Sequence, residues 1–185
     1  MSKSKGNILF QLTGSIACYK ACNIISQLVQ NGFSVKTICS QNALKFIGKS
    51  TLEGLTREIV HTDIFENKNI PGHIELAKWA DLAIICPATA NILNKLAAGI
   101  ADDYISSVFL AFDFSKPYLI APAMNKNMYA HPATQKAIKI LKDWKVEVID
   151  TADGHQACGD KGNGRLLEPN EIYKKIAGQL GGKTA

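Results

Sequence analysis

Four irregular stretches of the chain carry the residue types that could do chemistry. The longest, residues 157–166 (ACGDKGNGRL), holds three glycines and Cys158 and has no apolar periodicity, so we expect a mobile loop that covers a ligand. The others are residues 13–17 (TGSIA), 86–91 (CPATAN) and 121–125 (APAMN), each between a strand-like and a helix-like run. Because ligands of open α/β sheets bind beyond the carboxyl ends of the strands, the four stretches are expected to share one site.

The glycine and serine of the first short stretch could bind an anion. Gly14 lets backbone N–H groups approach a negative charge at a helix N-terminus, where the helix dipole favours it, and Ser15 can add a hydroxyl. An ordinary turn in which Ser15 caps the helix is equally consistent with these residues. The stretch lacks the full G-x-G-x-x-G pattern, so a nicotinamide dinucleotide is not indicated.

Three further polar side chains stand at the ends of expected elements. His73 follows Pro-Gly at a helix N-terminus, where the dipole favours a neutral imidazole that can accept a proton, although its position alone favours a capping role. Asn125 offers donors and an acceptor to a carboxylate, although an asparagine bonded to its own turn is common. Ser40 ends another expected strand and is interpreted as a cap.

The elements that must position these residues alternate along the chain. Apolar runs predict strands at residues 7–12, 33–39, 59–60, 81–86, 118–121 and 146–149. Periodic runs predict helices at residues 16–29, 43–47, 51–55, 73–80, 92–98, 104–112, 132–144 and 169–177. The continuous apolar run at 81–86 is typical of a central parallel strand. The fold class is therefore α/β, a three-layer Rossmann-like (flavodoxin-like) doubly wound parallel sheet, in a single domain over residues 1–185 with its core at about 7–177.

Composition narrows the classes of function. The formal charge of +5 is spread without a dense basic run, which favours small anions weakly and argues against a nucleic-acid partner. The five cysteines lack zinc-ribbon spacing, so we expect no metal site and a reducing, cytoplasmic setting. The N-terminus does not resemble a signal peptide, and no apolar run reaches the roughly 20 residues that span a bilayer, so no membrane partner is expected.

Three of the stretches together resemble the signatures of the homo-oligomeric flavin-containing cysteine decarboxylases. They are residues 87–91 (PATAN), 122–129 (PAMNKNMY) and 157–165 (ACGDKGNGR), and the resemblance extends from about residue 8 to residue 176. It implies FMN bound between neighbouring subunits of a homo-oligomer, a trimer or a multiple of it. It further implies a small phosphorylated, cysteine-containing substrate: decarboxylation of 4′-phospho-N-pantothenoyl-L-cysteine to 4′-phosphopantetheine in coenzyme A biosynthesis.

The resemblance also implies a role for each matching residue. His73 would be the catalytic base and Cys158 the proton donor on the closing flap. Flavin would oxidise the substrate thiol to a thioaldehyde, which accepts the electrons left by CO₂. The expected substrate-binding residues are Met124, Asn125, Ala157 and Gly159. The expected flavin-binding residues are Gly14, Ser15, Ile16, Ala17, Ser40, Pro87, Ala88, Thr89, Ala90, Asn91 and Ala123.

Other functions share parts of this pattern. Decarboxylases of a C-terminal peptidyl cysteine in lantibiotic maturation have the flavin loops but generally lack the clamp at residues 157–160. Non-catalytic flavin-binding regulatory subunits carry long extensions that this sequence lacks, and flavin prenylation would require different loop residues. Tyr129 stands where the family more often has tryptophan, which is expected to alter packing rather than chemistry. Many bacterial members continue into a synthetase domain, so the chain is either a monofunctional enzyme or part of a longer one.

Overall fold

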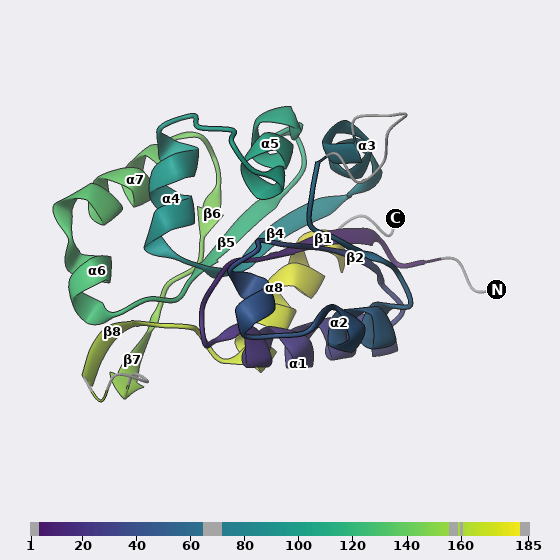
Figure 1. Ribbon diagram of the computed structural model, residues 1–185, viewed down its shortest axis with the longest axis horizontal. Coiled ribbons are helices and arrows are strands. Elements are labelled where there is room, and N and C mark those ends of the chain that lie inside the picture. The colour runs from purple at the N-terminus through teal and green to yellow at the C-terminus, as the bar shows by residue number, and fades with distance from the viewer. Residues whose placement is uncertain (1–3, 65–71, 156–158, 160, 182–185) are drawn as a thin grey trace.

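A parallel β-sheet forms the centre of the molecule in a computed structural model, which describes residues 4–64, 72–155, 159 and 161–181 (Figure 1). Within these ranges the sheet has six strands in the order β3-β2-β1-β4-β5-β6, and every pair of neighbours is parallel. The strands are β1 (Asn7–Leu12), β2 (Ser34–Cys39), β3 (Val60–His61), β4 (Leu82–Ala88), β5 (Tyr118–Pro122) and β6 (Glu147–Val148).

Helices cover both faces of this sheet. One face carries α1 (Cys18–Gln30), α2 (Lys49–Thr56) and α8 (Pro169–Gly181). The other carries α3 (Gly72–Trp79), α4 (Ala90–Ala97), α5 (Tyr104–Ala111) and α7 (Pro132–Asp143). In the described ranges no helix combines the length and hydropathy that a membrane crossing requires. The predicted three-layer α/β architecture is confirmed.

Alternating side chains of the strands divide the core into two clusters. Ile8 and Phe10 of β1 pack against α1 and α8, whereas Leu9 packs on the opposite side, against the α3 and α5 layer. All seven residues of β4 are buried, as expected of a strand with helices on both faces. This alternation explains why the apolar runs located the central strands well.

Three segments differ from the expectation. Residues 161–165, predicted as loop, form β8 (Lys161–Arg165), which pairs antiparallel with β7 (Ala152–His155) in a hairpin. Backbone pairing holds this strand although its sequence lacks apolar alternation, and its glycines take left-handed backbone angles, with φ +148° at Gly162 and +109° at Gly164. Helix α6 (Lys126–Ala130) begins within the predicted loop at 122–129, and the predicted helix at 43–47 is a short 3₁₀ turn, η1 (Ala43–Lys45).

Candidate functional site

A cavity of about 590 Å³ lies at the edge of the sheet where the strands end. Its wall combines the loop after β1, the loop after β5 and the end of β8, so segments far apart in the sequence meet there. The lining residues are Gly14, Ser15, Ile16, Ala17, Tyr19, Lys20, Phe46, Thr89, Ala123, Met124, Asn125, Met128, Gly164, Arg165 and Leu166.

Eight of the predicted site residues line this cavity, and they come from three of the four irregular stretches. They are Gly14, Ser15, Ile16, Ala17, Thr89, Ala123, Met124 and Asn125. Five other predicted residues lie outside the wall: Ser40, Pro87, Ala88, Ala90 and Asn91. Gly159 is exposed, and Ala157 and Cys158 lie outside the described residues. Flavin and substrate contacts of all these residues remain predictions.

The residues outside the wall support those that form it. The carbonyl oxygen of Pro87 accepts a hydrogen bond from the N–H of Thr13 at 3.2 Å, and that of Ala88 accepts one from the N–H of Ala123 at 2.9 Å. Ser40 accepts a bond from the N–H of Ala43 at 3.1 Å, so the capping role expected for this serine is observed. These bonds fix the ends of neighbouring strands relative to one another.

Thr13 connects two of the loops and was not among the predicted site residues. Its hydroxyl donates to the carbonyl oxygen of Pro87 at 2.7 Å and accepts from the N–H of Thr89 at 3.0 Å. Thr13 is only 4 % exposed, so both bonds are shielded from water. The sequence signal was a hydroxyl residue directly after an apolar strand, which is common at strand ends and therefore weak.

The loop after β1 presents unused backbone donors to the cavity. Within the described residues, the N–H groups of Gly14, Ser15 and Ile16 donate no hydrogen bond. The hydroxyl of Ser15 accepts from the N–H of Ala17 at 3.3 Å, where α1 begins, and the first turn of α1 has no acidic residue. Three unused donors at a helix N-terminus are suited to an anion.

Asn125 both lines the cavity and begins α6. Its side-chain oxygen accepts a hydrogen bond from the N–H of Asn127 at 2.8 Å, so the turn-bonding alternative is observed. The preceding residue, Met124, donates its N–H to the carbonyl oxygen of Gly164 at 2.9 Å. This bond attaches the β7–β8 hairpin to the loop after β5, which brings the end of β8 into the wall.

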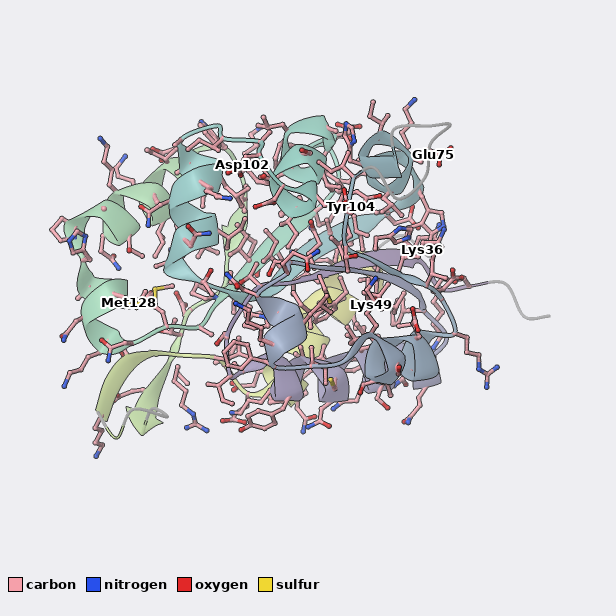
Figure 2. All side chains as sticks on the ribbon, viewed as in Figure 1. Lys36, Lys49, Glu75, Asp102, Tyr104 and Met128 are labelled. Atoms are coloured by element: carbon pink, nitrogen blue, oxygen red, sulfur yellow. The ribbon has the colours of Figure 1, made fainter. Side chains whose placement is uncertain are left out.

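His73 lies apart from the cavity of its own chain. It is the second residue of α3, which packs against α5, and it does not line the cavity. Figure 1 shows α3 and the β7–β8 hairpin at opposite ends of the molecule, and Figure 2 shows Glu75 of α3 on the side opposite Met128 of the cavity wall. The Nδ1 atom of His73 is buried and has no hydrogen-bond partner among the described residues, so a helix-capping bond is not formed there.

Two other histidines and four cysteines have structural surroundings in the described part of the chain. The Nδ1 atom of His131 accepts a hydrogen bond from the N–H of Ala133 at 3.2 Å and caps α7, and the ring of His61 packs edge-on against Tyr104. Burial raises the pKa values of the thiols of Cys18, Cys22 and Cys86, and that of Cys39 to about 12. These thiols are therefore poor nucleophiles at neutral pH; Cys18, Cys39 and Cys86 are buried as expected, whereas Cys22 is partly exposed.

Seven residues of the wall escaped the prediction: Tyr19, Lys20, Phe46, Met128, Gly164, Arg165 and Leu166. Tyr19 and Lys20 belong to the first turn of α1, and Gly164 and Arg165 to a strand that was expected to be a loop. The sequence held no signal for Tyr19 and Phe46, because the exposure of their side chains, 59% and 47%, is known only from the folded structure.

Comparisons with known proteins agree with this arrangement. The chain is 45% identical over 170 residues to a Bacillus subtilis "Coenzyme A biosynthesis bifunctional protein CoaBC". The aligned region covers 91% of this chain but 41% of that protein. The chain is 39% identical over 175 residues to a Streptococcus mutans "Probable phosphopantothenoylcysteine decarboxylase", covering 94% of this chain and 98% of that one. Among solved structures, "The FMN binding protein AtHal3" superimposes with a TM-score of 0.87 at 29% identity over 98% of this chain and 100% of its own.

The chain thus spans about two fifths of the length of the bifunctional relative and nearly all of the Streptococcus mutans one. The sequence family described as "Flavoprotein" matches residues 1–181, which includes every described strand and helix. The chain therefore belongs to the Flavoprotein family.

Proposed function

We propose that the chain binds FMN and catalyses the decarboxylation of 4′-phosphopantothenoylcysteine to 4′-phosphopantetheine, a step of coenzyme A biosynthesis. The observation that carries the proposal is the cavity beyond the ends of β1 and β5, with unused amide donors on one wall and Asn125 on another, in a chain of the Flavoprotein family. The names of the relatives support the substrate, and that of the solved structure supports the cofactor.

The residues of the cavity fit FMN. The cavity volume of about 590 Å³ is within the usual range of small-molecule sites. The unused N–H groups of Gly14, Ser15 and Ile16 suit the phosphate, since helix N-termini bind phosphate through such donors. The small side chain of Ala123 leaves room for a flat ring, and the apolar side chain of Met124 also lines the cavity. We assign residues 14–17 to the flavin phosphate and Thr89 and Ala123 to the remainder of the cofactor.

The chemistry divides between the cofactor and the chain. When bound, flavin would supply the electron sink through reversible hydride transfer. His73 accepts the proton of the thiol, and Cys158 protonates the carbon that has lost CO₂. Asn125 binds the departing carboxylate with a neutral amide, which holds the group without stabilising its charge as strongly as a cation would.

The separation of His73 from the cavity supports a site shared between subunits. We propose a homo-oligomer, a trimer or a multiple of it, in which His73 of one subunit serves the cavity of its neighbour. The rim of the cavity exposes Ile16, Tyr19, Phe46 and Met128, each 47% or more accessible, and such an apolar surface suits a subunit contact.

The free thiols of the described cysteines support a cytoplasmic location.

The first experiment combines spectroscopy with turnover. The purified protein should show the visible absorption of FMN and release CO₂ from 4′-phosphopantothenoylcysteine. Cys158→Ser should release CO₂ but accumulate the oxidised enethiol product, whereas His73→Asn should be inactive. A colourless protein would contradict the cofactor, and turnover of a peptide with C-terminal cysteine in place of this substrate would favour the lantibiotic-type alternative.

The shared site has its own test. When His73→Asn and Cys158→Ser chains are co-expressed, some cavities receive an intact His73 from one chain and an intact Cys158 flap from another. The rate at which 4′-phosphopantetheine, the saturated product, is formed should then return to a measurable fraction of the wild-type rate. Separately purified variants, assayed after mixing without subunit exchange, are the control and should stay defective.

A further inference from the structure

The cavity wall carries an excess of positive charge. Among its described residues, Lys20 and Arg165 are the cations, and none is Asp or Glu. The other lining residues are apolar or neutral. A cavity with this balance favours anionic ligands.

One carboxylate holds both cations in place. Glu168 accepts hydrogen bonds from the Lys20 Nζ atom at 3.1 and 3.2 Å and from the Arg165 Nη2 atom at 2.5 Å. These residues come from α1, from β8 and from the loop before α8, so the cluster joins three elements. Two cations share a single negative charge, which leaves one net positive charge.

Arg165 is also positioned from the opposite strand. A Cβ atom on Gly154 would lie 3.0 Å from its Nη1 atom, so the glycine of β7 leaves space for the guanidinium. Within the described part of the chain, Glu168 is the one acceptor of Arg165 hydrogen bonds. This bond uses one of the five N–H donors of the guanidinium. The remaining donors form the fork that binds a phosphate group through two oxygens.

We propose that Lys20 and Arg165, held by Glu168, form the subsite for the phosphate group of the substrate. The assignment rests on the proposed decarboxylase function. The substrate carries two anionic groups, and the carboxylate is the poorer partner for these cations, because a cation that stabilises a departing carboxylate opposes loss of CO₂. The phosphate is unchanged by the reaction, so cations there improve binding equally in the ground and transition states.

The test compares a substrate with its dephosphorylated form. KM and kcat for CO₂ release are measured with 4′-phosphopantothenoylcysteine and with pantothenoylcysteine. Arg165→Met should raise KM for the phosphorylated substrate by roughly tenfold or more, the usual effect of losing a hydrogen bond to a charged group, with kcat within about twofold of wild type. KM for pantothenoylcysteine should not change. Lys20→Met should act in the same direction, and it leaves the hairpin untouched if the arginine variant folds poorly.

Two controls separate charge and cofactor effects. Lys174→Met removes one positive charge from an exposed position of α8 outside the cavity and should leave both KM values unchanged. The dissociation constant for FMN should also stay at the wild-type value in both cavity variants. If it rose as much as KM, the cations would belong to the flavin phosphate and the proposal would be overturned.

Binding measured without turnover distinguishes this inference from the proposed function. Equilibrium dialysis of 4′-phosphopantothenate and pantothenate should show that Arg165→Met and Lys20→Met weaken only the phosphorylated compound. If the wild type releases no CO₂ from either substrate, the function fails, and the dialysis still decides the subsite. Equal losses for the two compounds, or no loss for either, in both variants would overturn the subsite even in an active enzyme.

Discussion

The close approach of Gly14 to Asn42 allows a quantitative test of how the cavity is built. A Cβ atom on residue 14 would lie 2.6 Å from the Asn42 Cβ atom and 3.1 and 3.2 Å from its backbone carbon and oxygen. Carbon atoms in contact are normally about 3.5–4.0 Å apart, so Gly14→Ala must separate the two loops by roughly 1 Å. A side-chain rotation cannot relieve this clash, because the atoms that it meets are backbone or directly attached to it.

The cost of Gly14→Ala follows from that displacement. Added carbons in packed regions cost about 1–3 kcal/mol, and each kcal/mol lowers the Tm of a domain of this size by roughly 2–4 °C. The same shift moves the N–H groups proposed to bind the flavin phosphate. We expect the Kd for FMN to rise roughly tenfold, as for the loss of one charge-assisted hydrogen bond, and the Kd for riboflavin to change less. Thermal unfolding of the apoprotein and fluorescence titration with each flavin measure the two effects.

Two variants check the steric explanation. Gly54→Ala places a methyl group on an exposed position of α2 with no atom within 4 Å, so it should raise stability by about 0.5–1 kcal/mol through helix propensity. Asn42→Gly combined with Gly14→Ala removes the closest contact and should restore part of the lost Tm and FMN affinity. Wild-type Tm and FMN affinity in Gly14→Ala alone would refute the reasoning.

Three further substitutions test the interactions around the site and the core. Thr13→Val should lower Tm and FMN affinity together, because it leaves the Thr89 N–H without its acceptor, at a cost of about 1–3 kcal/mol in urea unfolding. Tyr118→Phe should cost a similar amount, since the Gln11 Nε2 atom loses its 2.8 Å partner in the core, and adding Gln11→Leu should recover much of it. Burial raises the pKa of the Asp103 carboxyl, but hydrogen bonds from its capping box and from a lysine outweigh this, so the pKa is below its ordinary value. Stability from this group is present above the unfolded pKa and lost as pH falls, so the deficit of Asp103→Ala, about 1 kcal/mol at neutral pH, should shrink as pH falls below about 4 in denaturant unfolding.

The predictable parts of the fold are the strands and helices whose burial requires apolar residues in a regular pattern. β4 is buried on both faces, and its continuous apolar run located it to within two residues. β8 carries no such signal, because its pairing with β7 uses the backbone and its side chains are mostly glycine or polar. A strand of this composition forms because it pairs with β7, and the residue pattern of the segment itself does not indicate that pairing.

The candidate site also contains residues that were predictable from the sequence and residues that were not. Residues that directly follow a parallel strand, such as Ser15 and Asn125, were predictable because the ends of parallel strands converge on one edge of the sheet. Phe46 and Arg165 reach the cavity from η1 and from the hairpin, so their contribution depends on tertiary packing. Lys20 and Arg165 are joined through Glu168, which is 148 residues away from Lys20 in the chain.

The strand order explains both the place of the cavity and the absence of His73 from it. The chain builds outward from β1 to β3 and then returns to start β4 on the other side of β1, so the topology reverses between β1 and β4. The helices on either side of the reversal lie on opposite faces, which opens a crevice where Thr13 and Thr89 face each other.

Helix α3 lies on the face opposite α1 and packs against α5, and its His73 does not line the cavity of its own chain. Co-expression of His73→Asn with Cys158→Ser therefore tests the topology as well as the chemistry. If activity returns, each cavity uses a histidine from a neighbouring chain. If the co-expressed pair is as defective as either parent although the subunits mix, the cavity does not use a histidine from a neighbouring chain, and the shared site must be withdrawn.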